Sequence, residues 1–336
     1  MGNAIAAHSR GTMKAIVQDG YGSADVLRLR EIEKPLVSDH DVLVRVRAAS
    51  VNALDWHVVR GGPFLHMMAF LLRQPKITVR GVDVAGHVEA VGKNVTRLKP
   101  GDEVFGSARG AFAEYVAARE DRLVPKPRRL TFEQAAAVGV AGVTALQGLR
   151  DKARLQPGQR VLIHGAGGGV GTFAVQIAKA LGAYVTAVTS TRNLDVVRSI
   201  GPDEVIDYTQ EDFTLRAQRH DVIFDVAATR SLADLRRVLE PKGTLVLAGA
   251  AKSDGFAPLA RILKALALSR VVSQRLVPYI ATVRQDDLVV LKELIEAGKL
   301  SPVIDRTFPL SEAADAVGYV GTGQARAKVV INVSST

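Results

Sequence analysis

Hydrophobic and polar residues follow one pattern in the first part of the chain and another in the rest. Between residues 13 and 130 the apolar runs are short, rich in β-branched residues and separated by turn residues, as at 13–18, 42–47, 84–91 and 114–117. Short runs of this kind, bounded by turns, predict β-strands rather than helices. We therefore expect a compact β-rich domain over residues 13–130.

The pattern changes at Thr131, which with Gln134 forms a capping box before an alanine-rich stretch. Such a box predicts the first turn of a helix. From residue 160 onward, short apolar runs alternate with stretches of helical periodicity. Strands are predicted at 160–164, 183–189, 204–207, 221–226 and 243–248, with helices between them, for example at 172–181 and 231–240. This alternation predicts a doubly wound parallel sheet with helices on both faces, over residues 131–284.

The last part of the chain, residues 285–336, combines both patterns. A helix is predicted at 286–297, with Asp286 and Asp287 at its start and Gly298 just after its end. Residues 302–333 are again strand-like and rich in turns. Because a chain of 336 residues is long for one domain, we expect two domains, with the last segment returning to the first.

A glycine cluster lies between the predicted strand at 160–164 and the helix that follows it. Its spacing is Ala166-x-Gly168-x-x-Gly171, and a second strand follows the helix. A helix that begins after such a turn presents bare backbone N–H groups to a pyrophosphate. The alternative is a flexible loop that only joins two elements, and the strand–turn–helix context disfavours it. Candidate dinucleotide contacts are therefore Gly167, Gly168, Gly169 and Val170.

The residues after the second strand indicate which dinucleotide is bound. Units that bind NAD carry an acidic residue about 20 residues after the glycines, where it holds the ribose 2′-hydroxyl. Here residues 189–193 read Thr-Ser-Thr-Arg-Asn, and no carboxylate follows until Asp195. Hydroxyls and an arginine favour a 2′-phosphate, so we expect NADP(H), held by Ser190, Arg192 and Asn193. Alternatively, this segment is a solvated turn in which Arg192 has no specific role.

Cysteine is absent, which excludes disulfides, thiolate metal sites and cysteine catalysis. The absence suits an intracellular chain, and the first twelve residues lack the apolar core of a signal sequence. We therefore expect a cytoplasmic location. No apolar run is long enough to span a membrane.

The formal charge is +10, but the basic residues are scattered and are not interleaved with aromatic residues. This distribution favours a solvated basic surface, and no nucleic-acid partner is expected. The segment 256–284 is both apolar and basic, a combination found in helices that lie on membranes. Since alanine and leucine occupy several of its faces, we favour a helix packed at a subunit or domain contact.

Several stretches together resemble the medium-chain dehydrogenase/reductase superfamily, in its quinone-oxidoreductase-like branch. They include SVNALDWHVVRGG (50–62), GVDVAGHVEAVG (81–92), HGAGGGVG (164–171) and ARAKVVI (325–331). The resemblance implies an α/β fold with a GroES-like β-rich domain and a Rossmann domain, an active site between them, and a homodimer. In zinc-dependent members a Cys and a His hold the catalytic metal. Asn52 and Val82 stand at those positions, so the resemblance implies a zinc-free member.

The resemblance also assigns residues to the site. It puts Asn52 near the nicotinamide, where its amide could donate to a carbonyl, and His57 at the position of a proton relay. Alternatively, Asn52 closes a turn and His57 is a partly exposed helix residue. Further cofactor contacts are implied at the nicotinamide side, the adenosine phosphate, the end of the fifth strand and the C-terminal return: Thr144, Tyr208, Gly249, Ala250, Arg326 and Lys328.

Without a metal, negative charge that develops during hydride transfer must be stabilised by hydrogen bonds. A quinone or an enone spreads that charge through a conjugated system, whereas a simple ketone concentrates it on one oxygen. The expected reaction is therefore NADPH-dependent reduction of a quinone or an activated C=C bond. Two alternatives remain. One is an NADPH-binding protein of low turnover with an RNA or protein partner, and the other is an alcohol or carbonyl dehydrogenase.

Overall fold

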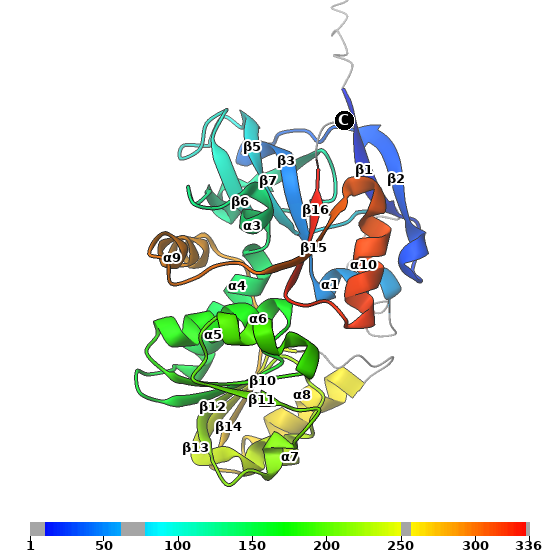
Figure 1. The fold of residues 1–336 in the computed structure, drawn as a ribbon. Helices are drawn as coiled ribbons and strands as arrows, with labels where there is room; N and C mark the ends of the chain where they lie inside the picture. The colour runs from blue at the N-terminus through cyan, green and yellow to red at the C-terminus, as the bar shows by residue number, and fades with distance from the viewer. Residues whose placement is uncertain (1–10, 62–77, 250–256, 334–336) are drawn as a thin grey trace, which may run out of the picture.

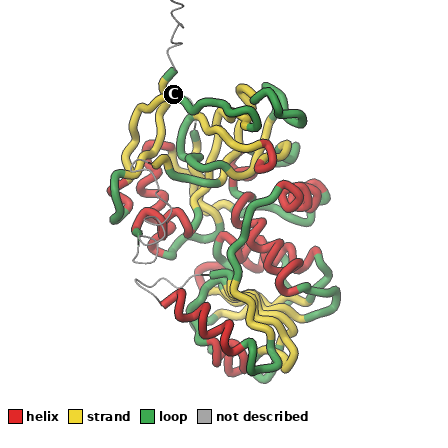
Figure 2. Tube along the Cα trace, turned by 180° about the vertical axis from the view of Figure 1, so that it is seen from behind, coloured by secondary structure: helices red, strands yellow, loops and turns green. Residues whose placement is uncertain are grey.

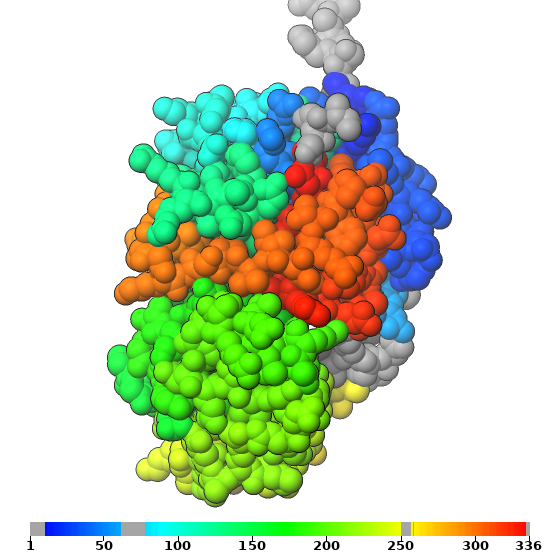
Figure 3. Space-filling view, viewed as in Figure 1, coloured from blue at the N-terminus to red at the C-terminus, as the bar shows by residue number. Residues whose placement is uncertain are grey.

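A computed structural model describes residues 11–61, 78–249 and 257–333, which fold into two stacked α/β units (Figure 1). Most of the upper unit comes from the first third of the chain, and the lower unit from the middle. The C-terminal segment lies against both of them, which is plain in the space-filling view of Figure 3.

The upper unit is built on a sheet that the described strands form in the order β15-β16-β3-β5-β6-β8, with β7 paired to β3. Two strands from the end of the chain, β15 and β16, therefore complete a sheet begun near its start. The strands are β3 (Asp41–Val51), β5 (Asp83–Val91), β6 (Glu103–Ser107), β7 (Tyr115–Arg119), β8 (Leu123–Pro125), β15 (Ile304–Pro309) and β16 (Lys328–Asn332). A smaller sheet beside it has the order β2-β1-β4, from β1 (Thr12–Gln18), β2 (Leu27–Glu33) and β4 (Thr78–Val79).

The lower unit is a parallel sheet with the order β11-β10-β9-β12-β13-β14. Its strands are β9 (Arg160–His164), β10 (Tyr184–Thr189), β11 (Glu204–Asp207), β12 (His220–Asp225), β13 (Leu239–Leu247) and β14 (Arg275–Pro278). Helices cover both faces of this sheet, which Figure 2 shows from behind. Strand order reverses between β9 and β12, and ligands of such sheets bind at the carboxyl ends of the strands at this point. The five strands predicted from residue 160 to 248 are all present.

The described helices are α1 (Ala53–Arg60), α3 (Phe132–Ala136), α4 (Gly139–Leu146), α5 (Gly169–Ala180), α6 (Leu194–Ser199), α7 (Leu232–Arg237), α8 (Ala257–Leu268), α9 (Gln285–Glu296) and α10 (Ala313–Thr322). The Thr131 capping box is confirmed, since its side chain accepts from Gln134 N–H at the start of α3. Residues 302–333 contain the strands β15 and β16, as the strand-like pattern predicted, but also helix α10, which was not predicted. This helix buries Ala313, Ala316 and Val317 at helical spacing.

Helix α4 joins the two units through one continuous apolar core. Its residues Val143 and Leu146 belong to a buried cluster that contains Phe105 of β6 as well as Val161 and Ile163 of β9. Packing through a shared helix holds the two sheets in a defined relation. The predicted domain limits at residues 130 and 284 remain a prediction.

Candidate active site

The glycine cluster forms a tight turn between β9 and α5. Gly165 has a φ of +95°, which favours glycine, and a side chain at Gly171 would overlap the Gly165 carbonyl oxygen. Helix α5 begins at Gly169, and its N-cap residue, Gly168, supplies no side-chain cap. The first N–H groups of this twelve-residue helix are therefore available to an anionic ligand.

A buried polar atom without a partner lies next to this turn. The Asn193 side chain is only 7% exposed, and its Oδ1 accepts no hydrogen bond from the described residues. A Cβ at Gly167 would lie 2.5 Å from Asn193 Nδ2, so a larger residue there would displace the Asn193 side chain. An orphaned acceptor beside a glycine turn fits a ligand that brings a donor, such as a ribose hydroxyl. The residues present thus suit a dinucleotide.

The residues expected to select the nucleotide gather at the carboxyl ends of β10 and β11. Ser190 directly follows β10, and the Tyr208 side chain is 47% exposed while its N–H donates to Thr189 O. The Arg192 guanidinium is exposed and donates to Gly323 O (2.8 Å) at the end of α10. Sequence reasoning missed Asp207, which ends β11 and accepts from the Thr191 hydroxyl at 2.6 Å.

The C-terminal return lies directly against the glycine turn. Ala327 N–H donates to Gly167 O (2.9 Å), and Ala327 pairs with Gly168 as an isolated bridge. Arg326, one residue before, has an exposed side chain. Lys328, one residue after, is buried, and a Cβ at Gly169 would lie 3.1 Å from its Cδ. Arg326 therefore faces solvent near the turn, whereas Lys328 runs past it into the first domain.

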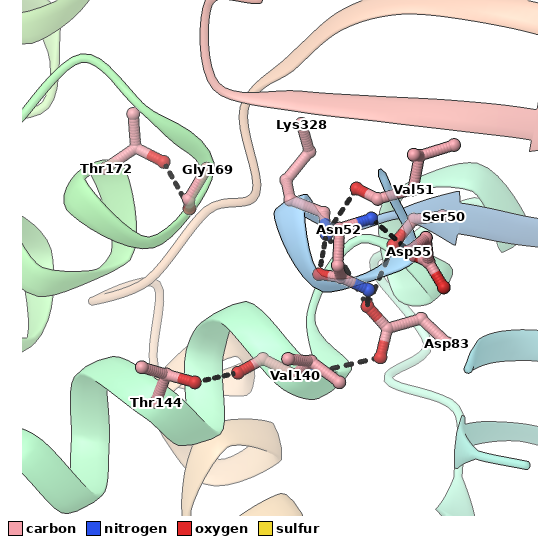
Figure 4. A network of polar contacts seen from close by, with 10 residues as sticks. All are labelled: Ser50, Val51, Asn52, Asp55, Asp83, Val140, Thr144, Gly169, Thr172 and Lys328. Carbon is pink, nitrogen blue, oxygen red and sulfur yellow. Dashed lines mark hydrogen bonds and ion pairs between the residues drawn. The ribbon is translucent and has the colours of Figure 1, made fainter. Parts of the chain in front are cut away.

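Asn52 stands where β3 meets α1, and charged groups of opposite sign hold its amide (Figure 4). Its Nδ2 donates to Asp83 Oδ2 (2.9 Å), and its Oδ1 accepts from Lys328 Nζ (2.8 Å). An ammonium has only donors and a carboxylate only acceptors. The oxygen of this amide must therefore face Lys328 and its nitrogen must face Asp83.

Asp83 and Lys328 are both buried and have further partners. The Asp83 carboxylate also accepts from Ser50 Oγ (2.9 Å) and from Val140 N–H (2.7 Å) near the start of α4. Lys328 Nζ also donates to Val51 O (3.2 Å) and approaches Asp83 Oδ2 at 3.5 Å. Burial lowers the pKa of the Lys328 ammonium, and the negative charge of Asp83 opposes this shift.

Asp55 lies on the first turn of α1 below this network, and its Oδ2 accepts from Asn52 N–H (2.7 Å). Burial raises the pKa of the Asp55 carboxyl group to about 7, although the hydrogen bond from Asn52 opposes the shift. The carboxyl group therefore orients the loop that carries Asn52.

Thr144 is linked to the Asn52 network through Val140, whose N–H donates to Asp83 Oδ1 (Figure 4), and His57 lies on α1 beyond Asn52. The His57 ring is half-buried on α1, with its centroid 4.9 Å from that of Trp56. Trp56 packs against Gly321 of α10, where a side chain would overlap the indole. The Thr144 hydroxyl donates to Val140 O (2.7 Å) in its own helix, and its carbonyl accepts from the Tyr279 hydroxyl. Their roles toward cofactor or substrate remain predictions.

Gly249 follows β13, and a side chain there would overlap the carbonyl oxygen of Val226. The chain therefore makes a close backbone approach at the edge where a dinucleotide is expected. Ala250, the other residue predicted at this edge, lies outside the described residues.

Sequence reasoning also missed a buried polar cluster at the point where strand order reverses. His164 ends β9 and Asp225 ends β12, and His164 Nδ1 lies 2.8 Å from Asp225 Oδ1. Arg261 of α8 donates to Asp225 Oδ2 (2.6 Å). Neighbouring parallel strands bring their last residues together, so the ends of the predicted strands could have identified the His164–Asp225 pair. Arg261 could not be found in this way, because it comes from a helix distant in sequence.

Within the described ranges there is no cluster of three or more His, Cys, Asp or Glu side chains arranged to hold a metal. No helix in those ranges is both long and apolar enough to cross a membrane.

The glycine turn lies before an uncapped helix, at the point where strand order reverses and beside a second domain. These features are typical of two-domain proteins that bind a dinucleotide. The family model for the alcohol dehydrogenase GroES-like domain matches residues 38–128, and that for a zinc-binding dehydrogenase matches residues 200–331. The chain belongs to the medium-chain dehydrogenase/reductase superfamily, in its quinone-oxidoreductase-like branch.

Similar proteins carry reductase names. The chain is 35% identical to 2-methylene-furan-3-one reductase of Solanum lycopersicum, over 95% of this chain and 79% of that protein. It is equally identical, with the same coverage, to the chloroplastic NADPH-dependent alkenal/one oxidoreductase of Arabidopsis thaliana. The quinone oxidoreductase of Coxiella burnetii has a similar structure, with a TM-score of 0.84 and 30% identity over 96% of this chain and 100% of that one. Since one relative is named as chloroplastic, the cytoplasmic location remains a prediction.

Proposed function

We propose that this chain is a zinc-independent, NADPH-dependent reductase of quinones or of the activated C=C bond of enones. The orientation of the Asn52 amide is the observation that carries the proposal. Relatives named as a quinone oxidoreductase and as an alkenal/one oxidoreductase support the substrate class. The cofactor is NADP(H), as the segment at residues 189–193 favours.

NADPH, when bound, supplies a hydride equivalent to the β-carbon of an enone or to a quinone ring. The chain has to stabilise the negative charge that then develops on the substrate oxygen. Asn52 Nδ2 carries two hydrogens, and the described contacts use one of them, toward Asp83. The second can donate to that oxygen. Because Lys328 holds Oδ1, the amide cannot turn its acceptor toward the substrate without losing a charged hydrogen bond.

The remaining requirement is a proton for the reduced product. Reduction of an enone adds one hydride and one proton, and the proton goes to the α-carbon. His57, one helical turn beyond Asn52, is the group we propose to supply it directly or through water, because a histidine exchanges protons near neutral pH. Asp55 is not the donor in this proposal, since its Oδ2 accepts from Asn52 N–H.

On the cofactor side, the first turn of α5 from Gly168 to Val170 and the adjoining Gly167 are proposed to hold the pyrophosphate. Ser190, Arg192 and Asn193, with Tyr208, are proposed to hold the adenosine ribose and its phosphate. Thr144 is proposed to line the nicotinamide side, Gly249 and Ala250 to contact the cofactor at the end of the fifth strand, and Arg326 to close over it. The Lys328 ammonium holds Asn52, and its contact with the cofactor remains a prediction.

The test is NADPH oxidation by the purified chain with enones, quinones and simple ketones, without added metal and after chelation. The proposal predicts turnover with enones or quinones and little with ketones. Asn52→Ala should lower kcat/KM by about 10²–10³-fold, the usual effect of removing one oxyanion donor. Asn94→Ala, an exposed asparagine of the same domain, is the matched control. Turnover that requires stoichiometric zinc, or an Asn52→Ala enzyme of normal rate, would overturn the proposal.

A further inference from the structure

Helix α8 packs on the parallel sheet by one side only. Its buried side contains Ala265, with no exposed surface, and Arg261, whose guanidinium donates to Asp225 Oδ2 (2.6 Å) and to Arg230 O (2.7 Å). The opposite side carries Ile262, Leu263 and Leu266, which are 37%, 58% and 47% exposed. Arg261 thus anchors the helix and leaves these aliphatic side chains in water.

The exposed aliphatic residues form one stripe. Positions 262, 263 and 266 lie on one face of a helix, because residues three and four apart are neighbours. Val271, just after the helix, is 78% exposed and extends the apolar surface. Leucine and alanine do occur around the whole helix, as the sequence indicated; Ala265 and Leu268 pack against the core of the sheet, whereas Ala260 and Ala267 are exposed. We call Ile262, Leu263, Leu266 and Val271 the α8 stripe.

Basic residues accompany the α8 stripe, and acidic residues are absent from the surrounding sequence. Lys264, Arg270 and Arg275 are exposed, and none of them forms an ion pair within the described residues. From residue 255 to residue 285 there is no Asp or Glu. By contrast, Lys179 is paired with Asp203 on another part of the same unit. The surface therefore combines aliphatic side chains with uncompensated positive charge.

We propose that the α8 stripe and its flanking cations dock the protein onto the surface of an anionic lipid bilayer. Aliphatic side chains enter the boundary between headgroups and acyl chains, while lysine and arginine meet the lipid phosphates. In a two-fold contact with a second copy, the cations of one copy would lie close to the same cations of the other. Their repulsion disfavours a dimer through this face. A nucleic acid would leave the aliphatic side chains without an apolar partner, and the stripe has no aromatic ring for base stacking.

The docking is peripheral and reversible. Helix α8 has only twelve residues and stays anchored to the sheet through Arg261, so it lies along the bilayer surface and does not enter the core. The inference does not depend on the proposed reaction, although a lipophilic quinone or enone would be concentrated in such a surface.

The test is co-sedimentation of the full chain with vesicles of phosphatidylcholine, alone or mixed with phosphatidylglycerol. We expect binding to the mixed vesicles, much weaker binding to phosphatidylcholine alone, and release by high salt. Leu263→Gln with Leu266→Gln should abolish binding. Leu29→Gln with Leu36→Gln, which changes two leucines that are 42% and 64% exposed in the first domain, should leave it intact.

A second pair of variants tests the charges. Lys264→Glu with Arg270→Glu should weaken binding at least 30-fold, on the order of what two lost surface cations contribute. Lys93→Glu with Lys299→Glu, two exposed lysines elsewhere, should change it little. Circular dichroism and thermal melting verify that each variant folds. Failure of the wild type to bind anionic vesicles overturns the inference. So does a stripe variant that turns a dimer into a monomer in analytical ultracentrifugation, since a second copy would then cover the stripe.

Discussion

Replacing Lys328 by methionine tests whether the buried ion network sets the orientation of Asn52. Methionine keeps most of the stem beside Gly169 but removes every donor. Three contacts are lost, to Asn52 Oδ1 (2.8 Å), Val51 O (3.2 Å) and Asp83 Oδ2 (3.5 Å). Breaking a buried charge pair costs about 3–5 kcal/mol when the remaining charge is left without compensation.

The expected destabilisation by Lys328→Met is at the lower end of that range, about 3 kcal/mol. Asp83 keeps donors from Ser50 Oγ, Asn52 Nδ2 and Val140 N–H, so its charge stays hydrogen-bonded. Burial also lowers the pKa of the Lys328 ammonium, so the charged amine already carries a desolvation cost that methionine avoids. Because small domains have about 5–15 kcal/mol of stability, the variant should still fold.

The effect of Lys328→Met on kcat/KM reports how Lys328 positions Asn52, separately from its effect on the free energy of unfolding. Asn52 would keep its contact with Asp83 but lose the cation that holds Oδ1, so kcat/KM for an enone should fall about tenfold, less than on loss of the whole amide. Urea unfolding and NADPH oxidation at saturating cofactor measure the two effects. Asp83→Asn added to Lys328→Met should recover part of the stability but not the activity.

Lys93→Met is the control, since Lys93 pairs with Asp39 on the surface and its side chain is 73% exposed. Its stability should change by less than about 0.5 kcal/mol. If Lys328→Met also stays within that limit and retains full kcat/KM, the account of the Asn52 network is refuted.

Three further predictions concern other parts of the site. Arg192→Ala should weaken NADPH about tenfold and leave NADH unchanged, and equal weakening of both cofactors would mean that Arg192 serves only the Gly323 carbonyl. His57→Ala should lower kcat roughly tenfold and change its pH profile, and an unaltered profile would exclude a proton role. The pKa of Asp55 is about 7 in the folded state and 3.8 in the unfolded state. Between pH 4 and pH 7 the carboxyl group therefore ionises in the unfolded state first, which should lower the unfolding free energy by about 4 kcal/mol in total. Above pH 7 both states are ionised, and no further change is expected. Urea titrations of Asp55→Asn across this range should lack that slope, and an identical slope in the variant would contradict the burial of Asp55.

Much of the parallel sheet could be predicted from the sequence, because its strands are continuous apolar runs separated by helical periodicity. The glycine turn could also be predicted, because all the residues that form it lie in one short segment of the sequence. Helix α10 was not predicted, and it contains Gly318 and Gly321, residues of low helix propensity. Gly321 lets the Trp56 indole approach the backbone.

The polar networks could not be predicted from local pattern, since their members are distant in sequence. Lys328 and Asn52 are 276 residues apart, and only the return of β16 to β3 brings them together. The motif ARAKVVI indicated a lysine near the cofactor, but not that its ammonium passes the turn and reaches the first domain. Asp207 was missed in the same way, because a carboxylate that approaches from the neighbouring strand has no signature in the sequence after β10.

The central claim is that a hydride passes from NADPH to a conjugated substrate beside the Asn52 amide. It is tested most directly by turnover of an enone with NADPH deuterated at C4 of the nicotinamide, in metal-free buffer. The account predicts a saturated ketone with one deuterium on the β-carbon, formed by the wild type and hundreds of times more slowly by Asn52→Ala. An allylic alcohol labelled at the carbonyl carbon, or no deuterated product from enones together with no NADPH oxidation by quinones, would contradict it.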